Sequence, residues 1–306
     1  MEDLRTVTYE ADGRVGRLTL DRPGSGNAIT MRMPAEIAAC VERANLDPEV
    51  HVIALTGNGS GFCAGYDLTA TAQDWSREEG TGAPEGSPLD PAVIAANHAP
   101  ESNWDPVTDF QMMSRNVRCF MSLFVSEKPV LCKVQGFCVA GGTDMALCSD
   151  LLVVADDAKI GYPPARVWGS PTTAMWAYRV GVMRAKRLLL TGDSLTGAEA
   201  AEWGLATESA PPEQLDGRFE SLVERVARLP VNQLVMMKLL TNQALYAQGL
   251  AASQVLGTVF DGITRHTEEG HEFVRRAAAG GFKEAVRERD EPFGDFGMGG
   301  HGVTPR

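Results

Sequence analysis

Residues 136–144 read GFCVAGGTD and lie between a strand-like run, VLCKVQ at 130–135, and a helix that begins near Gly142. An earlier run of the same kind, VHVIALT at 50–56, leads into a second glycine-rich turn, GFCAGYDL at 61–68. Buried strands that end in such turns and alternate with helices are typical of α/β folds. The two units therefore predict an α/β core with parallel strands.

The segments around these units fit the same interpretation. Alternating residues at 6–10 and 14–20 flank Asp12-Gly13, a pattern that indicates a β-hairpin. Helical spacing of apolar residues covers 30–45, and a further strand is predicted at 151–155.

From Thr172 onward the pattern is almost entirely helical. Thr196 and Glu199 have the spacing of a capping box. Helical spacing then covers 213–229 and 231–248, and further helices are expected to about 289. We therefore divide the chain into an α/β core, a helical region and a loose glycine-rich tail, at 1–195, 196–290 and 291–306.

The core contains an insertion at 73–106 that has no sustained periodicity. It is rich in acidic residues, proline and glycine, and it contains Trp75 and Trp104. A structureless segment of this length is uncommon inside a compact domain. Two interpretations stay open, a tolerated surface insertion and a lid over a site.

Charge restricts the partners of the chain. Its 306 residues include 28 Lys and Arg against 40 Asp and Glu, which gives a formal net charge of −12. This balance argues against a broad nucleic-acid or anionic-membrane footprint. A small anionic ligand remains compatible with it, because a few local cations and helix N-termini can bind phosphate.

The sequence also indicates a compartment. The charged N-terminus lacks the apolar segment of a secretory signal, and no apolar run is long enough to span a membrane. The six cysteines stand mostly in apolar strings and form no CxxC pair. We expect reduced core cysteines, a cytoplasmic location and no membrane span.

Histidines give no sign of a metal site. The five histidines are scattered, and His271-Glu272 does not continue into an HExxH motif. His266 and His271 are expected on the surface of a C-terminal helix. We predict no metal.

The two glycine-rich turns carry the strongest functional signal. Their small residues let backbone N–H groups approach a ligand closely. Two turns that face each other can hold a negatively charged oxygen between two N–H donors, which is an oxyanion hole. Asp144 follows Gly141 by three residues and is the predicted acid/base. The alternative is that Asp144 only caps the helix that begins there.

On these motifs, the chain resembles the crotonase (enoyl-CoA hydratase/isomerase) family over most of its length. The similarity begins at LTLDRPGSGNAIT (18–30), includes both glycine turns and continues to RAKRLLLTGDSLTGAEAAEWGLA (184–206). The turn at 61–68 matches the family pattern FCAGxDL. Both turns in this order, followed by LTGD, make the resemblance specific.

The resemblance implies a crotonase-type ββα spiral with a helical C-terminal trimerisation region, and hence a homotrimer or a dimer of trimers. It implies an acyl-CoA substrate, with coenzyme A as part of the thioester and no prosthetic group. The oxyanion donors that it implies are the backbone N–H groups of Tyr66 and Gly141. It places the adenine near Cys63 and Ala64.

Two further residues belong to the implied CoA-binding region. Asp67 matches the aspartate of FCAGxD, which is expected mainly to hold the structure of the turn. Arg276, in EGHEFVRR, is the candidate cation for the CoA phosphates, contributed to a neighbouring subunit. Asp150 is expected to be structural.

The chain departs from the family at its acids. Hydratases of the family use two glutamates, and the positions that match them here carry Asp144 and Pro164. Proline cannot transfer a proton. Arg166, two residues further on, is expected either to meet a substrate carboxylate or to pair with an acid such as Asp144.

Three explanations for the missing acid stay open. The insertion and its flank contain candidate replacements, namely Asp74, Glu78, Glu101, Asp105 and Asp109. The reaction can instead need one carboxylate, as in isomerisation or decarboxylation, or the protein can bind acyl-CoA without turnover. The leading expectation is hydration of a 2-enoyl-CoA.

Overall fold

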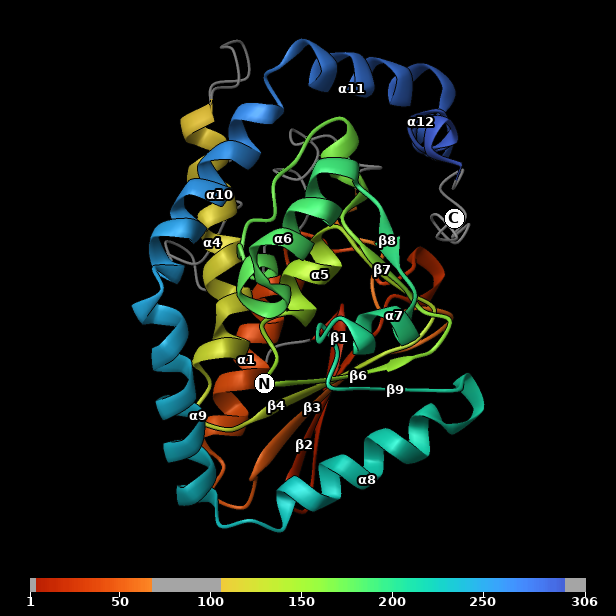
Figure 1. Ribbon diagram of the computed structural model, residues 1–306. Coiled ribbons are helices and arrows are strands. Elements are labelled where there is room, and N and C mark those ends of the chain that lie inside the picture. Colours follow the sequence, from red (N-terminus) through yellow and green to blue (C-terminus); the bar gives the residue numbers. More distant parts are fainter. Residues whose placement is uncertain (1–3, 68–105, 295–306) are drawn as a thin grey trace.

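A computed structural model of the chain describes residues 4–67 and 106–294, and a six-stranded sheet forms its centre (Figure 1). Its strand order is β1-β2-β3-β4-β6-β9. β1 and β2 form the predicted antiparallel hairpin, and every later pair in the sheet is parallel, as predicted. The strands are β1 Val7–Asp12, β2 Val15–Leu20, β3 Val52–Gly57, β4 Val130–Val134, β6 Leu151–Ala155 and β9 Glu208–Ala210.

A second, three-stranded sheet has the order β5-β7-β8 and comprises Phe137–Val139, Lys159–Gly161 and Ser194–Leu195. The chain passes from the large sheet to the small one and back, since β4 and β6 belong to the first while β5 and β7 belong to the second. Helices follow β5 and β7, so two successive turns have the order strand, strand, helix. The expected ββα spiral is confirmed.

The helices surround this core (Figure 1). Those of the first two thirds are α1 Met33–Leu46, α4 Pro106–Val125, α5 Gly141–Ala146 and α6 Trp176–Thr191, with the short turn η2 Pro163–Arg166 between α5 and α6. Those that follow are α7 Gly197–Glu202, α8 Leu215–Ala227, α9 Val231–Ala247, α10 Leu250–Thr264, α11 Glu268–Gly280 and α12 Phe282–Asp290.

Local signals set several of these boundaries. Gly13 has φ +55° in the hairpin turn, a conformation that costs glycine little. Thr196 and Glu199 form the predicted capping box at the start of α7.

The region after residue 195 is mostly helical, as predicted, but it also contributes β9 to the large sheet. α10 packs along α4 of the same chain. Gly262 permits this approach, because a Cβ there would lie 3.0 Å from the Pro106 carbonyl oxygen. The structure also describes η4, Glu291–Phe293, at the start of the predicted tail. The C-terminal helices thus cover their own core.

The core is apolar and contains every cysteine. All six cysteines are buried and free, as expected. Burial raises the pKa of the Cys63 thiol to about 12. Among the described helices, none combines the length and the apolar character that a membrane span requires.

One buried ion pair fastens α9 to the core. The Lys238 ammonium contacts Asp150 Oδ2 at 2.8 Å and donates to the carbonyl oxygens of Leu123 and Lys128 at 2.9 and 3.1 Å. Asp150 also accepts from the Val130 N–H at 2.7 Å. Asp150 is therefore structural, as expected, since it joins β4 to α9.

We predict that Lys238→Met lowers the free energy of unfolding by about 3 kcal/mol, because it removes the buried ammonium that neutralises half-buried Asp150. The control is Arg228→Met, which removes an exposed pair with Glu224 and is expected to cost less than about 1 kcal/mol. Urea unfolding measures both. Equal losses in the two variants would contradict this account of the pair.

Candidate active site

The two glycine-rich turns contact each other through their backbones. The Cys63 N–H donates to the Phe137 carbonyl oxygen at 3.1 Å, and the Val139 N–H donates back to the Cys63 carbonyl oxygen at 3.1 Å. The parallel pairing of β3 with β4 brings the two turns to the same edge of the large sheet. An oxyanion hole requires that the two turns face one another, and the structure joins them directly.

Glycine is required where the turns meet. A Cβ on Gly142 would lie 2.7 Å from the Cys63 carbonyl oxygen, which is too close for any side chain. Gly65 has φ +94°, and a Cβ there would lie 2.8 Å from Ala140 Cβ and 3.5 Å from Gly141 N. The backbones of Gly65 and Gly141 are therefore neighbours.

The backbone N–H groups of Tyr66 and Gly141 are available as donors. Neither donates a hydrogen bond to any other described residue. Gly141 is the first residue of α5, where an N–H has no partner inside the helix. Ala140, just before it, has φ 53° and ψ −127°, a strained conformation for a residue with a side chain. The backbone turns sharply there, immediately before the Gly141 donor.

Side chains from the preceding segment hold the first turn in place. Asn27 is fully buried and donates to the Gly61 carbonyl oxygen at 3.1 Å. Arg22 forms a salt bridge with Asp67 at 3.0 Å. The Asp67 N–H also donates to the Ile29 carbonyl oxygen at 2.9 Å. Asp67 therefore has the structural contacts that were expected of it.

Asp144 lies on α5 with 1% of its surface exposed. Its Oδ1 accepts from the Thr173 backbone N–H at 3.1 Å and from the Thr173 hydroxyl at 3.0 Å. Its Oδ2 is buried and has no partner among the described residues. The N-cap residue of α5 is Ala140, and no side chain caps the helix. The carboxylate is thus not a helix cap, and one oxygen remains open to a proton or a ligand.

Burial raises the pKa of Asp144 to about 7, because the buried site disfavours the charged carboxylate. Hydrogen bonds from Thr173 oppose this shift, and the charge of Asp261 adds to it. A group with such a pKa can both take up and release a proton near neutral pH. This is the property that a general acid/base needs.

Two tyrosines stand near Asp144. Burial raises the pKa of Tyr66 and of Tyr162, and the charges of Asp144 and Asp261 raise both further. The Tyr66 hydroxyl is buried without a partner among the described residues, as is Asn116 Oδ1 on α4. The neighbourhood of Asp144 is therefore polar and incompletely hydrogen-bonded.

Arg166 pairs with acids, but not with Asp144. Its guanidinium, 2% exposed, contacts Asp290 at 2.9 Å and Asp193 at 3.3 Å. It also lies 4.2 Å from the centre of the Phe293 ring. The predicted structural pairing with an acid is confirmed, but the acids are Asp290 and Asp193, because α12, remote in sequence, folds back over η2. Arg166 fastens the end of the C-terminal region to the core.

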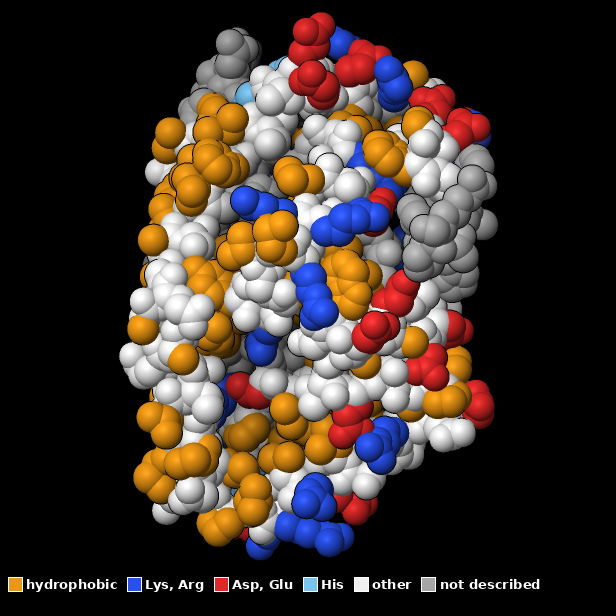
Figure 2. All heavy atoms as spheres, in the orientation of Figure 1, with side chains coloured by type: hydrophobic (Ala, Val, Ile, Leu, Met, Phe, Trp, Pro, Cys, Tyr) orange, Lys and Arg blue, Asp and Glu red, His pale blue; other side chains and the backbone are white. Residues whose placement is uncertain are grey.

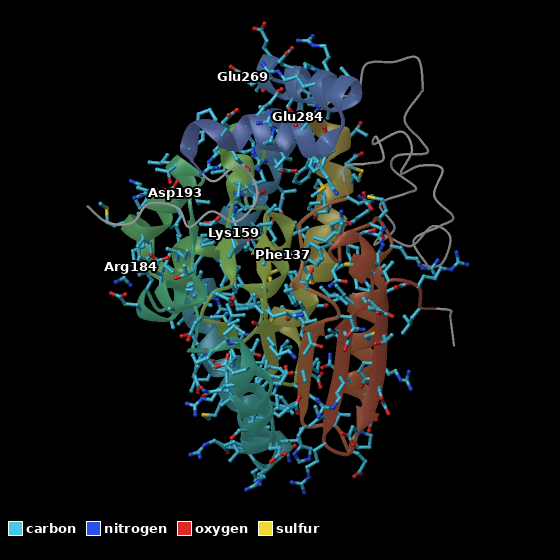
Figure 3. All side chains as sticks on the ribbon, turned by 90° about the vertical axis from the view of Figure 1, so that its right-hand side faces the viewer. Phe137, Lys159, Arg184, Asp193, Glu269 and Glu284 are labelled. Atoms are coloured by element: carbon cyan, nitrogen blue, oxygen red, sulfur yellow. The ribbon has the colours of Figure 1, made fainter. Side chains whose placement is uncertain are left out.

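The residues predicted to contact CoA lie in two places, the first glycine-rich turn and α11. Both backbone polar groups of Cys63 are used between the two turns, whereas Ala64 is exposed and its N–H donates to the Gly26 carbonyl oxygen. Arg276 on α11 contacts Glu272 at 2.9 Å and Glu288 at 3.8 Å. Figure 3 shows Glu269 and Glu284, which mark α11 and α12, at the top of the molecule and Phe137 below them.

Of the five candidate replacement acids, one lies among the described residues. Asp74, Glu78, Glu101 and Asp105 lie outside the described residues, as does the insertion except for Pro106. Asp109 is described, and it is fully buried on α4. Its oxygens contact Arg265 at 2.9 Å and His266 at 2.7 Å.

His266 follows α10 in the turn before α11 and is half-buried against Asp109, so the expectation of a surface helix position was wrong for it. His271 is exposed on α11, as expected.

Sequence reasoning missed Thr173 and the polar residues of α10. No local pattern identifies Thr173, because its contact with Asp144 spans 29 positions. A signal did exist for α10. Asp261 and Arg265, the C-cap residue of α10, stand four residues apart, as helical ion pairs do.

The fold agrees with comparisons to known proteins. A family model described as enoyl-CoA hydratase/isomerase matches residues 10–93 and 106–279. The chain therefore belongs to the enoyl-CoA hydratase/isomerase (crotonase) family, and is an enzyme of a family that acts on CoA thioesters.

Individual relatives show how close the similarity is. A crystal structure of enoyl-CoA hydratase from Mycobacterium smegmatis is 55% identical, with a TM-score of 0.88 over 98% of each chain. Putative enoyl-CoA hydratase EchA13 of Mycobacterium tuberculosis is 30% identical over 82% of this chain and 78% of its own. The 1,2-epoxyphenylacetyl-CoA isomerase of Escherichia coli is 27% identical, covering 79% and 83%.

We predict that Asp144 makes the protein less stable as the pH rises from 5 to 7. Its folded-state pKa of about 7 exceeds the value of about 3.9 in an unfolded chain. Between these values the native state holds a proton that the unfolded state lacks, so stability is lost as that proton leaves. The advantage of Asp144→Asn over wild type should grow by about 2 kcal/mol across this range.

Urea unfolding at pH 5 and at pH 7 measures this difference. Asp216→Asn, at an exposed position of α8, is the control and should show no such growth. An advantage of Asp144→Asn that is the same at both pH values would contradict the raised pKa.

Proposed function

We propose that this protein hydrates a 2-enoyl-CoA thioester. The observation that carries the proposal is the pair of free backbone donors, Tyr66 N–H and Gly141 N–H, beside a buried carboxylate with one unpartnered oxygen. The close similarity to a protein titled enoyl-CoA hydratase supports it.

The donors act on the thioester carbonyl oxygen. Hydrogen bonds to that oxygen polarise the carbonyl, which makes the β-carbon of a conjugated enoyl group electrophilic. When water adds there, negative charge develops on the same oxygen as an enolate. Fixed donors stabilise this charge without having to reorganise, by about 3 kcal/mol for each donor.

Asp144 is the acid/base of the proposed reaction. Thr173 holds Oδ1, which leaves Oδ2 as the oxygen that can exchange a proton with substrate. Because burial raises the Asp144 pKa to about 7, both protonation states are accessible at neutral pH. The proton that Asp144 delivers to the α-carbon completes the 3-hydroxyacyl product.

The CoA moiety is proposed to lie along the first glycine turn. The backbone groups of Cys63 are engaged, so the contact with adenine in this region falls to exposed Ala64. Asp67 supports the turn through its salt bridge with Arg22. Arg276 remains the proposed cation for the phosphates, supplied from a neighbouring subunit.

A second candidate function is an isomerisation or decarboxylation that needs one carboxylate. The observation that favours it is η2, where Pro163 and Pro164 occupy the segment in which family hydratases carry their second glutamate. The name of the Escherichia coli relative, 1,2-epoxyphenylacetyl-CoA isomerase, is consistent with an isomerisation.

We predict that Asp144→Asn lowers the rate of enoyl-CoA hydration about 10²- to 10⁴-fold, because it removes the group that transfers the proton. The assay follows loss of the conjugated enoyl thioester, and acyl-CoA affinity is measured in parallel. Asp216→Asn is the surface control.

The outcomes separate the two functions. Hydration by wild type that Asp144→Asn abolishes supports the proposal. Isomerisation or decarboxylation without hydration selects the second candidate. Tight binding without turnover on a broad acyl-CoA panel contradicts both. Hydration that Asp144→Asn leaves intact removes Asp144 from the mechanism.

We also propose that the chain assembles as a homotrimer or a dimer of trimers. Large apolar side chains are exposed along α9 and α10, on a side where Figure 2 shows hydrophobic side chains gathered. They are Met236, Met237, Leu239, Leu240 and Tyr246 of α9 and Val255, Leu256, Phe260 and Ile263 of α10.

Sedimentation of the wild type is expected to give three or six times the 32.9 kDa mass of the chain. Leu256→Asp places a charge in the apolar stripe and should shift the protein toward monomer. Met183→Asp, at an exposed apolar position of α6, should not. A monomeric wild type would contradict the proposal.

A further inference from the structure

One stripe of α10 holds the loop that carries Thr173, the partner of Asp144. The Gln254 amide donates to the Thr173 carbonyl oxygen at 3.2 Å, and the Thr258 hydroxyl donates to the Thr172 carbonyl oxygen at 3.4 Å. Further along the same stripe, Thr264 Oγ1 accepts from the Gly169 N–H at 2.9 Å. α10 therefore forms one wall of the Asp144 site, although it is remote from Asp144 in sequence.

Asp261 belongs to this stripe and points at the loop. Its Oδ1 accepts from the Ser170 N–H at 3.4 Å, and the residue is 6% exposed. Ser170 and Thr173 stand three residues apart, so one short loop holds the Asp261 and Asp144 carboxylates. Tyr66 and Tyr162 both experience the charge of each carboxylate.

The Asp261 carboxylate also lies near the position of the missing glutamate. A Cβ on Gly169 would lie 3.3 Å from Pro164 Cβ, 3.5 Å from the Tyr162 hydroxyl and 3.7 Å from Asp261 Oδ1. These three groups surround one point. A glutamate at position 164 would begin at that Pro164 Cβ, so α10 brings a carboxylate into the region that such a side chain would enter.

Asp261 and Asp144 differ in their charged partners. The Arg265 guanidinium donates to Asp261 Oδ2 at 2.6 Å and, with its other nitrogen, to Asp109 at 2.9 Å. No ion pair joins Asp144 to a cation among residues 4–67 and 106–294. Burial raises the pKa of both carboxyl groups, and the charge of Arg265 opposes this rise at Asp261 but not at Asp144. The cation beside Asp261 makes the two environments different, as in an acid/base pair.

We propose that Asp261 is the second acid/base carboxylate of this site and acts as the base toward water. The proposal rests on hydration being the reaction. It assigns to a residue of the C-terminal helix the role that proline at position 164 cannot perform.

In the proposed step, one carboxyl group takes up a proton and the other gives one up. Ionised Asp261 removes a proton from water as the water oxygen bonds to the β-carbon. The π electrons move to the thioester oxygen, between the N–H groups of Tyr66 and Gly141. The resulting enolate takes the proton of Asp144 at the α-carbon, which gives the 3-hydroxyacyl thioester. One proton then returns from Asp261 to Asp144, and the starting state is restored.

Other titratable groups face this pair, and any pH profile contains their influence. Those around Asp144 lie on the two glycine-rich turns, just after α5 and just after β7. Those around Asp261 lie on α4 and just after α10. They are Tyr66, Tyr162, Cys138, Cys148, Arg265, Asp109 and His266.

The test compares Asp261→Asn with Thr264→Val. Asparagine keeps an oxygen that can accept from the Ser170 N–H but cannot act as a base. Valine at position 264 removes the oxygen that accepts from Gly169 and changes no titratable group. If Asp261 only anchors the loop, Asp261→Asn is the milder variant. If it is the base, Asp261→Asn is much the more severe.

Two reactions are measured for each variant as a function of pH. The first is enoyl-CoA hydration, which needs both carboxylates. The second is exchange of the α-protons of a saturated acyl-CoA with D₂O, which needs only the oxyanion donors and Asp144. Thermal unfolding confirms that each variant is folded, and Asp261→Glu tests rescue.

We expect Asp261→Asn to lower hydration at least about 100-fold, Thr264→Val to lower it less than about tenfold, and Asp261→Glu to restore part of the rate. Exchange should persist in Asp261→Asn. Its pH midpoint should move down, because loss of a negative neighbour favours ionised Asp144. Hydration by Asp261→Asn at the level of Thr264→Val would overturn the proposal.

Failure of the proposed function has a different signature. If the wild type exchanges α-protons but does not hydrate, hydration is not the reaction, and the role of Asp261 as base toward water falls with it. The exchange midpoints still decide whether the two carboxylates are coupled. A downward shift in Asp261→Asn alone supports the pair, and no shift in either variant overturns it.

Discussion

The site depends on the direct backbone contact between two glycine-rich turns. Cys63 exchanges hydrogen bonds with Phe137 and Val139, and no side chain fits where Gly142 meets Cys63. The contact exists because β3 and β4 are parallel neighbours that end at the same edge. It makes Gly65 and Gly141 neighbours and leaves the N–H groups of Tyr66 and Gly141 without partners among the described residues.

The C-terminal helices hold the loop that lies beside Asp144. Thr173 holds one oxygen of Asp144, and α10 holds the loop that contains Thr173. At the end of the helical region, a salt bridge joins Arg166 of η2 to Asp290 of α12. The α/β core therefore supplies the donors and Asp144, while the helical region fixes the loop beside them. This coupling explains why a polar stripe persists in an otherwise apolar helix.

Local patterns predicted the elements that local physics determines. The turn at Asp12-Gly13, the Thr196 capping box and the strand at 151–155 each depend on neighbouring residues, and the structure confirms them. Asp144 and the two turns were also found, because a strand followed by glycine is visible in sequence. The pairing of Arg166 with Asp290 and the position of Asp261 could not be predicted, since they arise where α12 and α10 return to the core. The joining of β9 to the large sheet has the same cause.

In the proposed reaction, the thioester carbonyl oxygen of the substrate lies between the two glycine-rich turns. The most direct test is a crystal structure of the protein with a non-reactive acyl-CoA thioester analogue. The account predicts the thioester oxygen at about 2.7–3.1 Å from both Tyr66 N and Gly141 N, with Asp144 facing the acyl chain. A thioester bound with its oxygen away from both nitrogen atoms would contradict it.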